Sequence, residues 1–154
     1  MYAGFWKRFI AFVIDWIVNF FIGIIFILIW ALFELLLNSV GIEQKTKETI
    51  LGVLGVPIYL SLSWLYYALL ESSNQKATLG KMALGIVVVD INKNKISFLR
   101  ASVRYWSKII SSIILLIGFI MAGFTKDKQA LHDMISGTYV VNKSALTKGA
   151  EEVS

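Results

Sequence analysis

The first long apolar run of this chain carries a carboxylate, Asp15, close to its start. The run covers residues 9–37 and is long enough to cross a bilayer, which requires about 20 apolar residues. A carboxylate inside a membrane span costs at least about 2.5–3.5 kcal/mol unless a partner, water or an ion compensates it. Arg8 lies seven residues before Asp15 and therefore falls on nearly the same helix face, which Asn19 extends. What compensates Asp15 is the question that leads to function.

Composition indicates a membrane protein. The chain has 154 residues, of which 57% are hydrophobic and 16% charged, whereas soluble domains have about 25% charged residues. The absence of cysteine excludes disulfides and thiolate chemistry, and the single histidine, His132, excludes a zinc site built from several histidines of one chain. The sequence contains no GxSxG, P-loop or GxGxxG pattern. We therefore expect no enzymatic activity and no cofactor.

The distribution of charge predicts the topology. A second apolar run covers residues 49–70, and the loop at 38–48 has no net charge. Lysine and arginine are concentrated in residues 71–108 and at the N-terminus, which places both of these segments in the cytoplasm by the positive-inside rule. We expect residence in the plasma membrane, with the first run retained as a span because it is too long for a signal peptide. Anionic lipid headgroups explain the net charge of +5 better than nucleic acid does.

The third apolar stretch, residues 109–124, has two interpretations. As a helix it would extend only about 24 Å, which is less than the hydrocarbon core of about 30 Å. Basic residues flank it on both sides. These features favour a re-entrant or partly inserted segment, although a third crossing remains an alternative.

Residues 85–90 and 137–141 are two short β-type runs, and if they pair, both must lie in the cytoplasm. Residues 91–95 have the composition of a turn, and residues 96–98 would begin a return strand. Together these features predict a small cytoplasmic β element.

Residues 98–108 have the pattern of an amphipathic helix. Arg100, Arg104 and Lys108 are spaced four residues apart and are expected to face lipid headgroups. Val103 and Trp106 would then face the lipid chains.

The predicted fold is an all-α membrane protein with two full transmembrane helices, a third short or re-entrant apolar segment and the small β element. Residues 1–142 form a single membrane domain in this interpretation. Residues 143–154 are polar and are expected to form a disordered cytoplasmic tail.

Glu71, at the end of the second run, has two interpretations. It is either an interfacial residue of a solvated loop or a second carboxylate that shares a cytoplasm-facing cavity with Asp15. Two carboxylates at close range hold a proton or a monovalent cation well, because their repulsion raises one of the two pKa values.

Arg8 likewise has two candidate partners. It either forms a structural ion pair with Asp15, or pairs with Asp133 and leaves Asp15 for a cation. The adjacent His132 is either a satisfied structural residue or part of a gate.

Several sequence pieces stand out together: Tyr2–Arg8 with Asp15, Glu71–Ser73, Ala77–Lys81, Leu84–Gly85, Gln129–Asp133 and Gly137–Thr138. In their order and spacing they resemble the RDD family of integral membrane proteins. By this resemblance Arg8, Asp15 and Asp133 are the three charged positions of the family, and Lys7 stands where a second arginine is common. The resemblance also implies transport, because cation–proton antiport has been ascribed to some members.

Two functions from different classes follow. In the first, the chain is a transporter of a monovalent cation such as Na⁺, or of another small ligand, in exchange for H⁺. Asp15, Asn19 and Glu71 would bind the cation, and Arg8, His132 and Asp133 would form a charge pair or gate. A homo-oligomer is expected in that case, since two or three spans do not easily enclose a path. In the second, the chain is a non-transporting membrane scaffold or accessory subunit in which these charges are structural.

Overall fold

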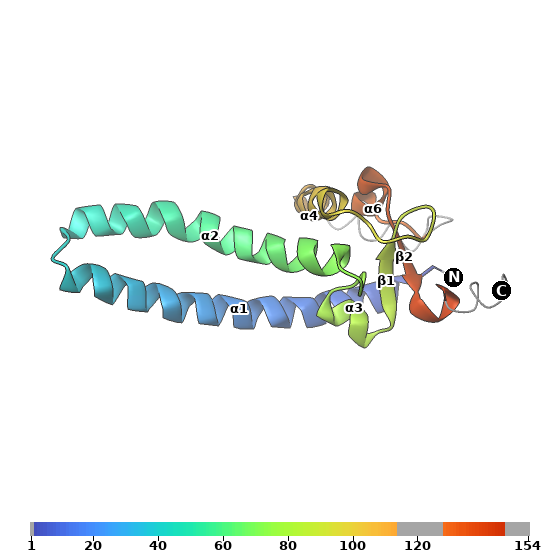
Figure 1. The fold of residues 1–154 in the computed structure, drawn as a ribbon, viewed down its shortest axis with the longest axis horizontal. Coiled ribbons are helices and arrows are strands. Elements are labelled where there is room, and N and C mark those ends of the chain that lie inside the picture. Colours follow the sequence, from blue (N-terminus) through green and yellow to red (C-terminus); the bar gives the residue numbers. More distant parts are fainter. Residues whose placement is uncertain (1, 114–127, 147–154) are drawn as a thin grey trace. The chain divides into compact units, whose positions relative to one another are not determined.

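The computed structural model describes residues 2–113 and 128–146, with side chains left out at 110–113. The described residues divide into two compact units. The hairpin unit comprises Trp16–Leu65, and the mixed unit comprises Met1–Asp15 together with Tyr66–Ser154. In chain order the elements are α1 (Phe5–Ser39), α2 (Gln44–Ser72), α3 (Leu79–Ala83), β1 (Ile86–Val89), α4 (Phe98–Ile113), α6 (Leu131–Ser136) and β2 (Tyr139–Asn142) (Figure 1).

The two apolar runs form α1 and α2, as predicted, and both helices extend beyond the predicted bounds. They contain 35 and 29 residues and are long and apolar enough to cross a membrane. At about 1.5 Å per residue, both exceed the hydrocarbon core of about 30 Å. Their ends therefore reach beyond the core or the helices tilt within it.

Within the hairpin unit, α1 and α2 pack through glycines placed against aromatic rings. A Cβ atom at Gly23 would lie 3.4 Å from the ring of Tyr59, and one at Gly55 would lie 3.4 Å from Trp30. Small residues let helix backbones approach closely, which is the usual packing mode of membrane helices. Tyr59 and Trp30 therefore serve packing between the two helices.

The mixed unit contains a two-stranded antiparallel sheet, which confirms the predicted pairing. Val87 of β1 faces Val141 of β2, and Tyr2 forms an isolated bridge to Val141. The sheet contributes Val87, Val89 and Val141 to a buried apolar cluster. Leu146 packs against the same cluster, so ordered contacts continue into the segment predicted to be a tail from residue 143. Residues 147–154 lie outside the described residues.

The predicted return strand at residues 96–98 is wrong, because α4 already begins at Phe98. The Ser97 hydroxyl accepts a hydrogen bond from the amide of Arg100 at 3.3 Å, which satisfies one of the free amides of the first helical turn. The preceding turn is present as predicted. Its Asp90 carboxylate accepts hydrogen bonds from the amides of Asn92 and Asn94.

Helix α4 confirms the predicted amphipathic helix, but its basic residues do not face headgroups as expected. Arg104 is 2% exposed, and Lys108 is also largely buried. Both side chains point toward carboxylates of neighbouring elements in the mixed unit, whereas Arg100 is exposed. Residues 114–127 lie outside the described residues, and so does most of the stretch interpreted as re-entrant.

Candidate functional site

Asp15 is buried in the mixed unit and accepts three hydrogen bonds. The Tyr66 hydroxyl and the Gly80 amide donate to Oδ1 at 2.8 and 2.9 Å, and the Thr78 hydroxyl donates to Oδ2 at 2.6 Å. These hydrogen bonds compensate the carboxylate for the water that it loses on burial. Since Thr78 and Gly80 flank the start of α3, Asp15 also joins this short helix to α1.

Close approach of the backbones makes this arrangement possible. A Cβ atom at Gly80 would lie 2.1 Å from the carbonyl oxygen of Ala11 and 2.9 Å from Cγ of Asp15. Only glycine fits at this position, because any side chain would collide with the backbone of α1. This close approach brings the backbone amide of Gly80 within hydrogen-bonding distance of Asp15.

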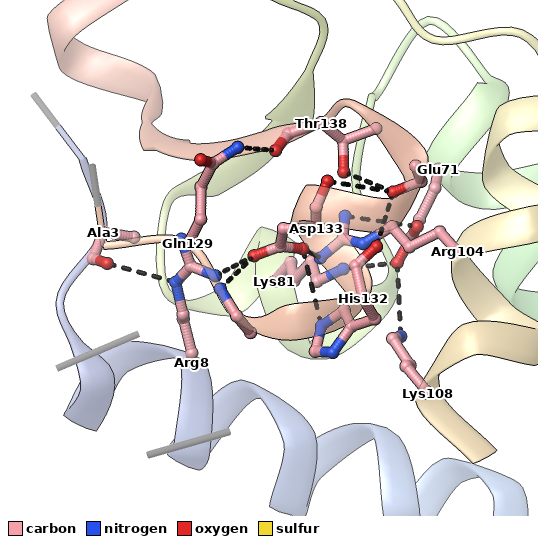
Figure 2. A network of polar contacts seen from close by, with 12 residues as sticks. Ala3, Arg8, Glu71, Lys81, Arg104, Lys108, Gln129, His132, Asp133 and Thr138 are labelled. Carbon is pink, nitrogen blue, oxygen red and sulfur yellow. Dashed lines mark hydrogen bonds and ion pairs between the residues drawn. The ribbon is translucent and has the colours of Figure 1, made fainter. Parts of the chain in front are cut away.

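A second cluster surrounds Asp133, at the start of α6 (Figure 2). Its Oδ2 pairs with the Arg8 guanidinium and accepts a hydrogen bond from the amide of Ala130 at 3.2 Å. Arg104 Nη2 lies 2.7 Å from Oδ1, and Nε2 of His132 lies 3.4 Å from the same oxygen. Two arginines from α1 and α4 thus converge on one fully buried carboxylate.

Glu71, at the end of α2, is buried among three cationic groups (Figure 2). Lys81 forms an ion pair with Oε1, and Lys108 Nζ lies 3.7 Å from the same oxygen. Arg104 Nη1 lies 3.4 Å from Oε2. The Lys108 ammonium also lies 4.2 Å from the centroid of the Tyr67 ring, a cation–π contact.

Arg104 links the two carboxylates, because it contacts Glu71 with one terminal nitrogen and Asp133 with the other. It thereby ties α4 to the end of α2 and to the start of α6. Four basic side chains share these two acids, so the cluster has more positive than negative groups; they are Arg8, Lys81, Arg104 and Lys108. Such a cluster is electrostatically suited to hold its own carboxylates rather than an added cation.

Burial and neighbouring charges shift the pKa values in this cluster. Burial lowers the pKa of Lys81 to about 7; repulsion by Arg104 adds to this effect, and attraction by Glu71 opposes it. Burial alone would raise the pKa of Asp133, but the charge of Arg104 holds it well below its usual range. Asp133 therefore stays ionised at neutral pH.

Burial also lowers the pKa of His132 to about 3; attraction by Asp133 opposes this effect, and repulsion by Arg104 adds to it. The imidazole is therefore neutral in the folded protein at physiological pH. Its contact with Asp133 is that of a neutral polar group, which fits the structural interpretation better than the gate.

The neutral state of His132 predicts a specific pH dependence. In the unfolded chain a histidine takes up its proton near pH 6.5, whereas folded His132 does so only near pH 3. The unfolded state binds more protons between these values, so stability is lost as the pH falls through that window, by up to about 1.4 kcal/mol per pH unit. We expect His132→Gln to flatten the slope of unfolding free energy against pH between about pH 6.5 and 4.5. An unchanged slope in the variant would show that His132 does not titrate in this way.

The structure decides between the two predicted partners of Arg8. Arg8 pairs with Asp133, the second of its two predicted partners, and Nε of Arg8 also donates a hydrogen bond to the carbonyl oxygen of Ala3 at 3.1 Å (Figure 2). Asp15 and Glu71 are held by two different sets of donors. Asn19 belongs to the hairpin unit, where its Oδ1 accepts a hydrogen bond from Ser63 at 2.9 Å. Among the described residues, no group of three or more histidine, aspartate or glutamate side chains is arranged to hold a metal ion.

Sequence reasoning missed the residues that hold these acids. Thr78, Gly80 and Lys81 lie in a sequence piece that carried the family resemblance, but nothing in their spacing showed which acid each would contact. Tyr66 lies within the second apolar run, where a tyrosine suits packing, and nothing in the sequence indicated its hydrogen bond to Asp15. The available signal was the presence of Thr78 and Lys81 on either side of Gly80, shortly after the end of the second apolar run.

Comparison with known proteins now gives the family. The sequence model described as the RDD family matches residues 2–137. The chain belongs to the RDD family.

Two relatives from Bacillus subtilis (strain 168) support this assignment. YxaI, described as an uncharacterized protein, is 36% identical over 148 residues, which cover 92% of this chain and 97% of YxaI. YteJ, described as an uncharacterized membrane protein, is 31% identical over 152 residues, which cover 96% of this chain and 85% of YteJ. No solved structure matches the chain. As an RDD protein with two candidate spans, the chain is a membrane protein.

The three charged positions of this RDD protein have unequal roles in its structure. Arg8 and Asp133 form an ion pair that links the start of α1 to α6. Asp15 instead binds hydroxyl and amide groups at the start of α3.

Proposed function

We propose that this RDD protein is a non-transporting membrane scaffold or accessory subunit, in which the buried charges hold the mixed unit together. The observation that carries the proposal is that each of the three buried acids has fixed partners. Asp15 accepts hydrogen bonds from three donors, Glu71 contacts three cationic groups, and Asp133 pairs with two arginines. Acids with such partners contribute to folding specificity and have no need of a bound ion.

The same contacts disfavour the alternative, exchange of a monovalent cation for H⁺. A cation at Glu71 would be repelled by Arg104, and by Lys81 and Lys108 in their protonated forms, all within 4 Å of its carboxylate. At Asp15, a cation would need oxygen lone pairs, whereas the neighbouring groups turn their hydrogens toward the carboxylate. Exchange would therefore require these groups to rearrange first.

We further propose that the chain resides in the plasma membrane with its N-terminus and its mixed unit in the cytoplasm. The concentration of lysine and arginine between residues 71 and 108 supports this orientation. The bridge between Tyr2 and Val141 supports a common side for the N-terminus and the sheet. The scaffold role requires no enclosed path, and so it does not depend on a homo-oligomer.

Ion flux and stability together distinguish the two functions. The protein would be reconstituted in liposomes that contain a pH-sensitive dye, and pulses of Na⁺, Li⁺ or K⁺ would be added outside. We expect no proton movement above that of empty liposomes, for the native chain and for Asp15→Asn alike. We also expect Asp15→Asn to lower the melting temperature and the folded yield, because Tyr66, Thr78 and Gly80 lose their charged acceptor.

Thr78→Val is the matched control, since it keeps the carboxylate and removes one of its donors. Under the scaffold proposal it destabilises the protein in the same direction as Asp15→Asn. A cation-dependent proton flux in the native chain that disappears in Asp15→Asn, at unchanged folded yield, would overturn the proposal in favour of exchange.

A further inference from the structure

Helices α4 and α6 expose apolar side chains on the outside of the mixed unit. The two helices pack against each other. We call their exposed apolar residues the α4–α6 face. Each member is between 38% and 72% exposed, and the members are Leu99, Val103, Trp106 and Ile109 of α4 with Met134 and Ile135 of α6.

The orientation of α4 is the reverse of that in a water-soluble protein. Its polar side, with Arg104, Ser107 and Lys108, is directed inward to the buried carboxylates, and its apolar side is directed outward. Proteins in water rarely leave a contiguous apolar face of this kind without a partner. The ion pairs of Arg104 fix this orientation, since turning the helix over would leave Glu71 and Asp133 buried without their shared arginine.

We propose that the α4–α6 face is a lipid-binding surface that inserts into the interfacial region of the bilayer. The same compact unit also contains the start of the transmembrane helix α1, with exposed Trp6 and Phe9, so the unit lies close to the bilayer. Trp106 has the side chain that is enriched at membrane–water interfaces. The proposal holds for a scaffold and for a transporter, and so it does not rest on the proposed function.

Charge at the edge of the face is complementary to anionic lipid. Lys93, Lys95 and Arg100 are exposed and lie just before α4 or in its first turn. Basic groups beside an apolar helical face bind the headgroups of anionic lipids while the apolar residues enter the acyl boundary. Arg104 and Lys108, which the sequence had assigned to headgroups, are engaged inside the protein.

The absence of cysteine from the chain permits a direct test. Single cysteines would be placed at residues 99, 103, 106 and 134, labelled with a nitroxide and reconstituted in liposomes of phosphatidylcholine and phosphatidylglycerol. Power-saturation electron paramagnetic resonance then measures access of oxygen, which concentrates in lipid, and of a water-soluble nickel complex. We expect oxygen access to exceed nickel access at all four positions.

Asn92→Cys, in the exposed turn before α4, is the matched control and should show the opposite ratio. Substitutions at such exposed positions change stability little, so the variants are expected to fold. Higher nickel access on the α4–α6 face would overturn the proposal by showing contact with water. Low access to both reagents would also overturn it, by showing that another part of the chain, a second copy or a partner protein covers the face.

A second measurement needs no label and changes the α4–α6 face only at Trp106. Tryptophan fluorescence of the native chain and of Trp106→Phe would be compared in liposomes with and without brominated lipids. We expect the component lost in Trp106→Phe to be quenched by the bromines. An unquenched component would contradict insertion of Trp106.

Discussion

Asp133→Asn is expected to lower the free energy of unfolding by about 3–5 kcal/mol, the usual cost of removing one partner from a buried ion pair. The change preserves the size of the side chain and removes the charge that Arg8 and Arg104 share. Asp133 is fully buried, so water does not replace the lost charge at the two guanidinium groups. Thermal unfolding in detergent, followed by circular dichroism, measures the loss, and size-exclusion chromatography measures the folded fraction.

Two further variants show whether charge is the cause. Glu43→Gln likewise replaces a carboxylate with an amide, but at an exposed position. It is expected to change the free energy of unfolding little. Combining Asp133→Asn with Arg8→Gln removes one of the orphaned cations and should cost less than the sum of the two single changes. Full additivity, or native-like stability of Asp133→Asn alone, would contradict a structural role for the pair.

Features set by neighbouring residues were predictable from the sequence. The apolar runs gave both long helices, because length and composition alone determine whether a segment suits a membrane. The two short β-type runs predicted both strands, because each is a short run rich in β-branched residues. The partner of Arg8 was one of two stated alternatives.

Features set by distant contacts were not predictable. The spacing of Arg100, Arg104 and Lys108 places them on one side of a helix. The same spacing is expected whether that side of the helix faces lipid headgroups or buried carboxylates. What decided between the two was the position of Glu71 and Asp133, which lie 33 residues before and 29 residues after Arg104 in the sequence. The prediction of a return strand at residues 96–98 was wrong for a local reason, because Ser97 caps the first turn of α4.

Gly80→Ala is expected to be nearly as damaging as the loss of Asp133. The added Cβ atom would lie 2.1 Å from the carbonyl oxygen of Ala11, and a backbone atom within a helix is not free to move aside. Overpacking of this kind costs about 1–3 kcal/mol and sometimes more. Displacement of α3 would also remove the hydrogen bonds of Gly80 and Thr78 to Asp15. The melting temperature in detergent should therefore fall clearly below that of the native protein.

Gly52→Ala is the matched control, since a Cβ atom at Gly52 would meet nothing within 4 Å and alanine favours a helix. It is expected to leave the melting temperature unchanged or to raise it. The comparison bears on function as well as on stability. If Gly80→Ala were as harmless as Gly52→Ala, α3 would not be docked against α1 in solution, and the donors around Asp15 would not be fixed. Asp15 would then be open to a cation, and cation–proton exchange would become the better explanation of its place in the chain.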